Sequence, residues 1–411
     1  MKLKRFFSRW LYWLYYAWLV MRDLPLVLSR QALAFNHDEV CNPAAGRVFA
    51  IVVKYGRIGV GDDFLMLLQA LRAHGVNAVV VHNGDIEDGA LAALRPVCHR
   101  LLVRRNIGRD FGAYRAVTLK LAEEQLSVDR LIYLNDSVIY LRRPGLQTLI
   151  SALARESRHV TAAFENHEIS HHVGSYVFSV PGWLLLAPDY LAFWRAYRPF
   201  NIRPYAIHRG EVALSQMLKK LGLIFDVLYS ADRLGLAMRM MKVSELVAVA
   251  SLRPRRHTPE VQALALTDLS QFTDLTQALH GGGGEASGGA MAKQAGLTTL
   301  RAPVLCDEPP QVAATTFGQL VKDRLVFNIL SVFMSRSQVH LGFGVYYRVM
   351  DCPFVKRDLL FQGIYDEMEL ARILSDLPRE EANGIIRQIA TRGRPVSMPF
   401  WRRFKHEHGL D

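Results

Sequence analysis

Residues 105–114 read RNIGRDFGAY, and residues 131–137 read LIYLNDS. The first stretch brings glycine and charged residues into a turn that opens a helix. The second is an apolar β-run that ends in an acid, Asp136. In open α/β sheets, ligands bind in the crevice beyond the carboxyl ends of the strands. The two polar clusters therefore predict a site there for a phosphorylated or sugar-like ligand.

Strands and helices alternate along the first part of the chain. Short apolar runs predict strands at 47–55, 78–82, 100–104 and 130–134. Amphipathic patterns between them predict helices at 62–75, 88–94 and 111–124. This alternation predicts an α/β fold with a mostly parallel sheet flanked by helices.

The pattern changes after Pro144. Strands are expected at 160–164 and 175–180, and helices at 187–197 and 211–221. A stretch rich in glycine and proline predicts a flexible insertion or linker. We therefore expect four regions: an N-terminal helix at 1–30, a ligand-binding domain at 46–250, the insertion at 251–320, and a helical C-terminal segment at 321–411 that completes the site.

The chain of 411 residues has a formal net charge of +12, which favours anionic partners such as nucleotide diphosphates and acidic lipids. The lysines and arginines are dispersed and no known nucleic-acid-binding module is present, so we expect no nucleic-acid partner. The four cysteines lie far apart and form no C-x-x-C pair, which suits a reducing cytoplasm.

The N-terminus reads MKLKRFFSRWLYWLYYAWLVMR over residues 1–22. Four basic residues precede an apolar run from Trp10 to Met21, which is shorter than the roughly 20 residues that a membrane-spanning helix needs. No small residues mark a signal-peptide cleavage site. Tryptophan and tyrosine beside cations are typical of an amphipathic helix lying on an anionic membrane surface. The alternative is a helix whose rings pack on the protein itself.

The turn at Gly108, Arg109 and Asp110 has two interpretations. Glycine, arginine and a helix N-terminus together can bind a diphosphate, or Asp110 can simply cap the helix. Asn135-Asp136-Ser137 also has two interpretations. Asp136 can bind a divalent ion or sugar hydroxyls, or the triplet can form an Asx turn that closes the strand.

Two motifs suggest chemistry that the surrounding sequence does not support. Residues 167–171 match H-E-x-x-H, but they lie between two β-like runs rather than on a helix, so we expect no zinc. Residues 56–61, GRIGVG, match neither G-x-G-x-x-G nor a Walker sequence, so we expect no nicotinamide or flavin.

Three charged residues elsewhere are also candidates. Glu211 is predicted to open a helix, where it either complements the helix dipole or acts as a general base toward an acceptor hydroxyl. Lys356 and Arg357 follow Pro353 and either neutralise a diphosphate or are surface charge.

Five stretches occur in a recognisable order: NIGRD at 106–110, LNDS at 134–137, HVGSYVF at 172–178, EVAL at 211–214 and CPFVKRDLL at 352–360, with His340 upstream of the last. Together they resemble the rhamnan synthesis F family of bacterial polysaccharide glycosyltransferases. The resemblance covers roughly residues 47–230 and 325–362. It implies a GT-A-like, Rossmann-like nucleotide-sugar-binding fold that acts in O-antigen (lipopolysaccharide), rhamnan or other cell-surface polysaccharide synthesis.

The resemblance also implies roles for particular residues. Glu211 takes the place of the base of an inverting hexosyltransferase, and Asp136 that of the metal-binding acid, with Mg²⁺ or Mn²⁺ as the expected ion. Expected donor-binding residues are Tyr55, Asn106, Gly108, Arg109, Asp110, Asn135 and Ser137. Expected acceptor or phosphate contacts are His172, Ser175, Lys356 and Arg357.

The resemblance implies a nucleotide-sugar donor, with rhamnose among the candidate sugars, and a lipid-linked or polysaccharide acceptor. We accordingly expect a cytoplasmic protein held peripherally on the inner face of the bacterial plasma membrane. The alternative hypothesis is a non-catalytic polysaccharide-assembly protein that binds a sugar nucleotide or a partner enzyme.

Overall fold

The computed structural model describes residues 2–56, 60–254, 319, 322–331, 337–393, 400–407 and 410. The insertion expected at 251–320 lies almost wholly outside these residues, as do the central residues of GRIGVG.

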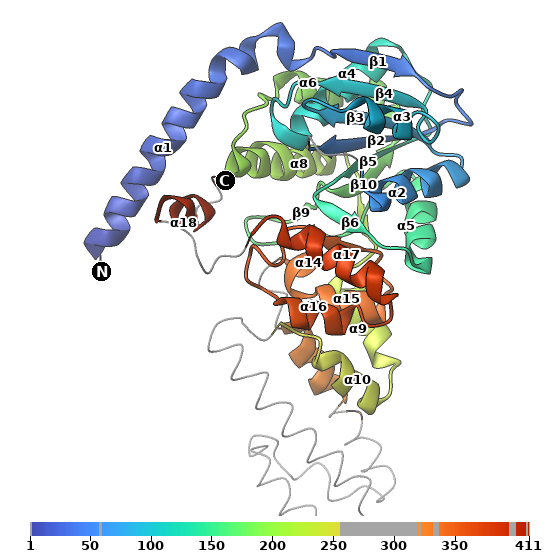
Figure 1. Ribbon diagram of the computed structural model, residues 1–411, viewed down its shortest axis with the longest axis vertical. Helices are drawn as coiled ribbons and strands as arrows, with labels where there is room; N and C mark the ends of the chain where they lie inside the picture. Colours follow the sequence, from blue (N-terminus) through green and yellow to red (C-terminus); the bar gives the residue numbers. More distant parts are fainter. Residues whose placement is uncertain are drawn as a thin grey trace, which may run out of the picture.

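A central sheet has eight strands in the order β1-β4-β3-β2-β5-β10-β7-β11 (Figure 1). The strands are β1 (His37–Val40), β2 (Val48–Tyr55), β3 (Asn77–Asn83), β4 (Arg100–Arg104), β5 (Arg130–Asn135), β7 (Val160–Ala162), β10 (Val177–Pro181) and β11 (Phe225–Val227). All of them except β1 and β10 run in one direction. The mixed α/β fold with a mostly parallel sheet flanked by helices is confirmed.

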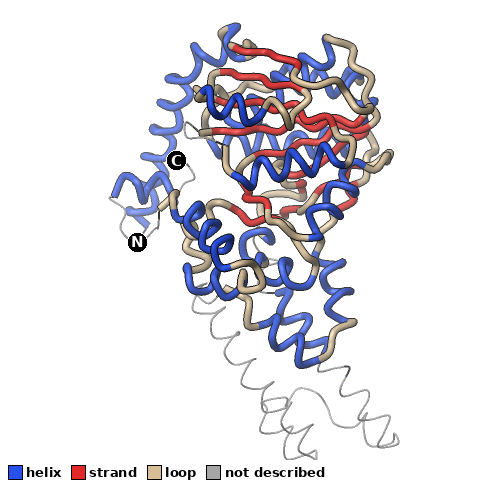
Figure 2. Tube along the Cα trace, turned by 45° about the vertical axis from the view of Figure 1, so that its right-hand side comes forward, coloured by secondary structure: helices blue, strands red, loops and turns tan. Residues whose placement is uncertain are grey.

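Helices cover both faces of this sheet (Figure 2). On one face lie α2 (Asp62–Ala73), α3 (Asp88–Leu94) and α5 (Pro144–Ala154). On the other lie α4 (Arg109–Glu123), α6 (Pro188–Ala196) and α8 (Ala213–Lys220). Ala50 and Val52 of β2 enter the first core, and Ile51 and Val53 enter the second. A continuous apolar run is what a strand buried on both faces requires.

The turn before α4 differs from the expectation. The helix begins at Arg109, and its N-cap is Gly108, which has a φ of 81°. A β-carbon at Gly108 would lie 2.2 Å from the Pro199 Cβ, so both the backbone conformation and the packing require glycine. The interpretation of Asp110 as the cap was therefore wrong. The strand expected at 175–180 also begins later, at Val177.

A helical part of the chain packs below the sheet (Figure 1). It consists of α9 (Ala231–Arg239), α10 (Val243–Ala250), α14 (Gln338–Leu341), α15 (Phe343–Val349), α16 (Glu367–Ile373) and α17 (Arg379–Ala390). The ribbon of β12 (Phe354–Lys356) and β6 (Val138–Tyr140) joins it to the sheet, with Lys356 opposite Val138. One hydrophobic cluster continues from α2 into α15 and α17. Helices that are about 300 positions apart in the sequence, α2 and α17, therefore share one hydrophobic core.

The N-terminal helix α1 (Lys2–Leu28) runs along one side of the molecule, with α18 (Phe400–Glu407) beside it (Figures 1 and 2). A small cluster of Leu19, Val27, Phe200 and Phe404 holds them together. Within the described ranges, no helix combines the length and the apolar character needed to cross a membrane.

Candidate functional site

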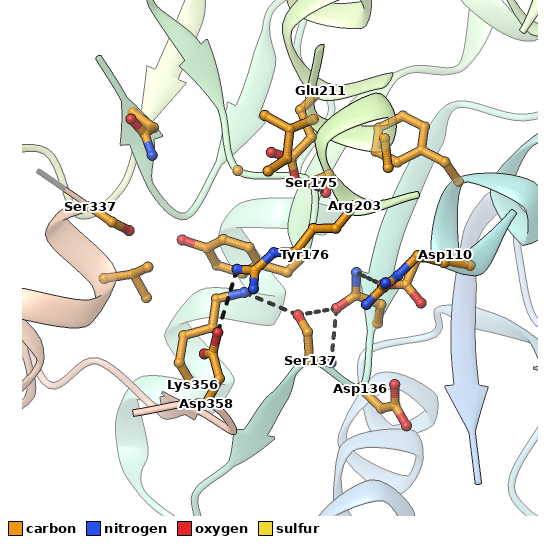
Figure 3. Close-up of a pocket in the computed structure, with 18 of the residues that line it drawn as sticks. Asp110, Asp136, Ser137, Ser175, Tyr176, Arg203, Glu211, Ser337, Lys356 and Asp358 are labelled. Carbon is orange, nitrogen blue, oxygen red and sulfur yellow. Dashed lines mark hydrogen bonds and ion pairs between the residues drawn. The ribbon is translucent and has the colours of Figure 1, made fainter. Parts of the chain in front are cut away.

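A pocket of about 550 Å³ opens at the carboxyl ends of β2, β3 and β5 (Figure 3). All of the site residues expected from the sequence line it except Gly108 and Arg357. Those lining it are Tyr55, Asn106, Arg109, Asp110, Asn135, Asp136, Ser137, His172, Ser175, Glu211 and Lys356. The folding of the chain therefore brings together residues that lie up to 301 positions apart, from Tyr55 to Lys356.

A buried arginine fixes the loop that carries Arg109. Arg104 donates hydrogen bonds to the Asn83 Oδ1 at 2.9 Å and to the Ile107 carbonyl at 3.2 Å. The Asn83 Nδ2 in turn donates to the Arg109 carbonyl at 3.1 Å. Arg109 has a φ of 54°, an uncommon value for a residue with a side chain. Burial lowers the pKa of Arg109. Asn83 was not among the residues expected from the sequence, although a polar residue at the end of a parallel strand was a signal.

Gly108 has a different role from the one expected. Its N–H donates to the Asn201 Oδ1 at 2.7 Å, and its α-carbon packs against Pro199. This amide is therefore used inside the protein, and Gly108 does not line the pocket. Its contribution is to let the chain pass Pro199 and turn into α4.

Asn135-Asp136-Ser137 forms the Asx turn that was one of the two interpretations. The Asn135 Oδ1 accepts hydrogen bonds from the Ser137 N at 3.1 Å and the Ser137 Oγ at 2.6 Å. The Asn135 Nδ2 donates to the Asp110 Oδ2 at 3.0 Å, and Lys356 donates to the Ser137 Oγ at 3.1 Å (Figure 3). One chain of hydrogen bonds thus connects Asp110 to Lys356. Burial and the neighbouring Asp136 raise the pKa of Asp110 to about 6.

Asp136 is already paired with a cation from the chain. Its Oδ2 accepts hydrogen bonds from the Lys54 Nζ and from the Tyr55 N–H, both at 3.0 Å. The side chains of Lys54 and Asp136 are only 12% and 15% exposed. A divalent ion at this carboxylate would have to compete with a largely buried ammonium group. The surroundings of Asp136 therefore do not fit the metal-binding acid that the resemblance implied.

Glu211 does not open a helix, so that prediction was wrong. Residues Arg203–Tyr205 are already helical, and Glu211 lies in the π-helical turn Ala206–Val212 that leads into α8. Such wide turns are frequent at functional sites. Gly210 allows the turn to lie against Phe111, whose ring atoms would be 2.9 Å from a β-carbon. The wide turn places Glu211 in the pocket lining.

The carboxylate of Glu211 has two partners. The Ser175 Oγ donates to its Oε1, and the His172 Nε2 lies 3.7 Å from its Oε2. Burial alone would raise the pKa of Glu211, but the neighbouring His172 and the hydrogen bond from Ser175 outweigh it and lower the pKa. Burial would likewise lower the pKa of His172, but Glu211 and the Ser170 carbonyl raise it. Both shifts favour a carboxylate beside an imidazolium.

Lys356 and Arg357 point to different surroundings, as neighbours at a strand end do. The Lys356 Nζ lies 3.7 Å from the centre of the Tyr176 ring, and burial lowers its pKa to about 8, although Asp358 and Glu211 oppose that shift. Arg357 bonds to the Asp63 Oδ2 at 2.9 Å. It also donates to the Asp136 carbonyl at 2.7 Å. The expected phosphate contact from Arg357 is therefore not supported: it joins α2 to the strand ends.

The pocket also contains residues to which the sequence analysis assigned no site role, although His340 was noted upstream of CPFVKRDLL. His340 bridges the Asp358 Oδ1 at 2.9 Å and the Ser337 Oγ at 2.8 Å. Arg203 lies 3.6 Å from the other oxygen of Asp358. The contact with His340 outweighs burial and holds the pKa of Asp358 well below its ordinary value. Asp358 stood inside CPFVKRDLL, whereas nothing in the sequence marked Arg203.

The H-E-x-x-H residues lie around a two-stranded ribbon, β8 (Glu165–Asn166) and β9 (His172–Val173). Ligand atoms of Glu165, His167 and His171 lie within 4.8 Å of one another. Lys219 donates to the His171 Nδ1 at 2.7 Å, which leaves the His171 Nε2 to donate to Glu165 at 2.7 Å. The two hydrogen bonds therefore occupy both ring nitrogens of His171 and one carboxylate oxygen of Glu165, the atoms that a metal would need. The grouping is therefore weak evidence for a metal, and the helix of a zinc protease is not found at these residues.

Comparison with known proteins adds one similarity. No protein-family model matches the chain. An uncharacterized protein, y4gN, of Sinorhizobium fredii (strain NBRC 101917 / NGR234) is 26% identical over 210 residues. Those residues are 50% of this chain and 53% of the relative, so the chain spans about half the length of the protein that it matches.

Proposed function

We propose that this protein is a GT-A-like glycosyltransferase of cell-surface polysaccharide synthesis. It would move a sugar, with rhamnose among the candidates, from a nucleotide-sugar donor to a lipid-linked or polysaccharide acceptor. The observation that carries the proposal is the composition of one pocket, in which Glu211, kept ionised by His172 and Ser175, is accompanied by Arg109 and Lys356. The volume of about 550 Å³ lies in the range of small-molecule and cofactor sites.

The proposed chemistry assigns a role to each side of the pocket. The donor's nucleotide and diphosphate lie at the strand ends, where Arg109 and Lys356 supply positive charge. Glu211 takes the proton of an acceptor hydroxyl while the oxygen of that hydroxyl forms a bond to the anomeric carbon of the donor sugar. The bond from that carbon to the diphosphate breaks, and the nucleoside diphosphate leaves with the electron pair. Attack from the side opposite the leaving group inverts the configuration.

The proposal includes no step through a metal ion. Lys54 already balances the charge of Asp136. We therefore assign Asp136 the role of tying the end of β2 to the turn after β5, through the Tyr55 N–H.

One observation favours the alternative of a binding protein without turnover. The partners of Glu211 lower its pKa, and a carboxylate with a lowered pKa is a weaker base. A scaffold of this kind would bind a sugar nucleotide through the same strand ends. Both hypotheses predict that the protein binds a sugar-nucleotide donor, but only the enzyme hypothesis predicts that the donor is consumed.

Thermal-shift binding tests the donor site shared by both. The panel contains dTDP-rhamnose with GDP- and UDP-sugars, each with Mn²⁺ or with EDTA, on the wild type and Arg109→Ala. A ligand that binds the native state raises the melting temperature. A selective shift that Arg109→Ala loses supports the donor site and names the nucleotide. The absence of a shift with any donor argues against the proposal.

A further inference from the structure

The N-terminal helix α1 presents a continuous apolar stripe to solvent. Its exposed large side chains are Trp10, Trp13, Leu14, Trp18, Met21, Leu24 and Leu28, each between 41% and 65% exposed. Trp13 and Leu14 are adjacent, and the other successive members are three or four residues apart, so all of them share one face of the helix. The opposite face contributes Leu19 and Val27 to the cluster with Phe200 and Phe404. The stripe therefore faces away from the protein.

Charge accompanies this stripe. The first nine residues contain Lys2, Lys4, Arg5 and Arg9 and no acid. The Arg22 guanidinium lies 5.3 Å from the centre of the Trp18 ring. On the neighbouring helix α18, Lys405 lies 5.4 Å from the Tyr15 ring, and Trp401 is 53% exposed. Tryptophan rings suit the depth of lipid headgroups, and lysine and arginine suit anionic lipids.

We propose that the stripe on α1 binds an anionic lipid bilayer, with α1 lying in the plane of the surface. An apolar stripe of this length is far larger than the scattered apolar residues of an ordinary protein surface. A helix of 27 residues is about 40 Å long, so it can lie along the surface with all three stripe tryptophans at headgroup depth. The occupant is a lipid surface rather than a second copy of the chain, because anionic headgroups balance the N-terminal cations, whereas α1 of a second copy offers only Asp23, which is buried against Asn201.

Vesicle co-sedimentation of the full chain tests this proposal independently of any donor binding. The vesicles contain about 30% phosphatidylglycerol in phosphatidylcholine, and pure phosphatidylcholine serves for comparison. The test variant is Leu14→Ser with Met21→Ser. The matched control, Leu236→Ser with Met240→Ser, removes the same two side-chain types from exposed positions in and just after α9, away from α1 (Figure 1).

The expected result is binding of the wild type to the anionic vesicles, with weaker binding to the neutral ones. Loss of two stripe residues should lower the partition coefficient roughly tenfold or more, while the control changes it less than about twofold. Brominated lipid should quench the tryptophan fluorescence of the wild type, which tests insertion without any variant. Wild type that stays in the supernatant overturns the proposal, and so does equal binding of the two double variants. A dimer that only the stripe variant converts to monomer would show a second copy on the stripe and also overturn it.

Discussion

The carboxylate of Asp23 accepts a hydrogen bond from the backbone N–H of Asn201 at 3.0 Å, although the two residues are 178 positions apart. Asn201 continues the connection, because its Oδ1 accepts the N–H of Gly108 at 2.7 Å. Asp23 is 3% exposed and lies on α1, where Arg22 also pairs with it. The helix that we propose to lie on a membrane is therefore linked through one residue to the turn that presents Arg109.

Substitution of Asn201 tests this link. Asn201→Ala removes the acceptor of the Gly108 N–H, and we expect the donor Kd to rise roughly fivefold, for a lost hydrogen bond of about 1 kcal/mol. Isothermal titration with the donor found by thermal shift measures the change. The control is Asn42→Ala, which removes bonds to the Arg95 and Cys98 carbonyls outside the pocket lining and should lower stability only. Unchanged donor affinity in Asn201→Ala would show that the link does not position the turn.

Replacement of Glu211 separates an enzyme from a binding scaffold. Glu211→Gln keeps the shape and the acceptor for Ser175 but removes the base. We expect turnover to fall by about 10²- to 10⁴-fold while the donor Kd changes little. Release of nucleoside diphosphate measures turnover, and Glu124→Gln, at an ion pair with Arg100 outside the pocket lining, is the isosteric control. Polysaccharide assembly that survives Glu211→Gln would favour the scaffold.

Ionisation of the buried Asp110 carboxyl should lower the free energy of unfolding of the protein. Its pKa is about 6 in the folded protein against an ordinary value of 3.8, so the folded state holds the proton more tightly. Wild-type stability therefore falls as the pH rises through this window, because the carboxylate must ionise where burial disfavours it. Asp110→Asn cannot ionise, and its amide oxygen can still accept from Asn135.

We expect Asp110→Asn to be more stable than the wild type above about pH 6, by up to about 3 kcal/mol, and to be equally stable near pH 3, which is below the ordinary pKa of 3.8. Urea unfolding at the two pH values measures the difference. Donor binding should be unchanged or stronger in the same variant, since a pocket that loses a negative charge beside Arg109 attracts an anionic diphosphate more strongly. A gain of the same size at both pH values would assign the effect to something other than ionisation.

Donor binding should not depend on a divalent ion. Lys54 balances Asp136, so the donor Kd of the wild type should change less than about twofold between Mn²⁺ and EDTA. Lys54→Met leaves Asp136 without its cation, and Mn²⁺ should then strengthen donor binding. Titrations of both proteins in both buffers decide the question. Loss of wild-type donor binding in EDTA would restore Asp136 as a metal ligand.

Local sequence patterns predicted six of the eight strands of the sheet and missed β1 and β11. The apolar runs that became β2 and β5 are buried on both faces, and burial of this kind depends on composition within a few residues. The position of the pocket followed as well, because polar residues after parallel strands meet at one edge. Membrane binding and catalysis stay predictions from the same patterns.

The amino-acid sequence by itself determined the α/β class, the strand ends and the basic aromatic character of the N-terminus. Only the tertiary structure decided that Lys356 lies beside Ser137, 219 positions away, while Arg357 turns to Asp63, because β12 pairs with β6. It also placed Glu211 in a π-helical turn. The physical reason is that periodicity and composition report local burial, whereas partners across the pocket depend on the register of strands that are distant in the chain.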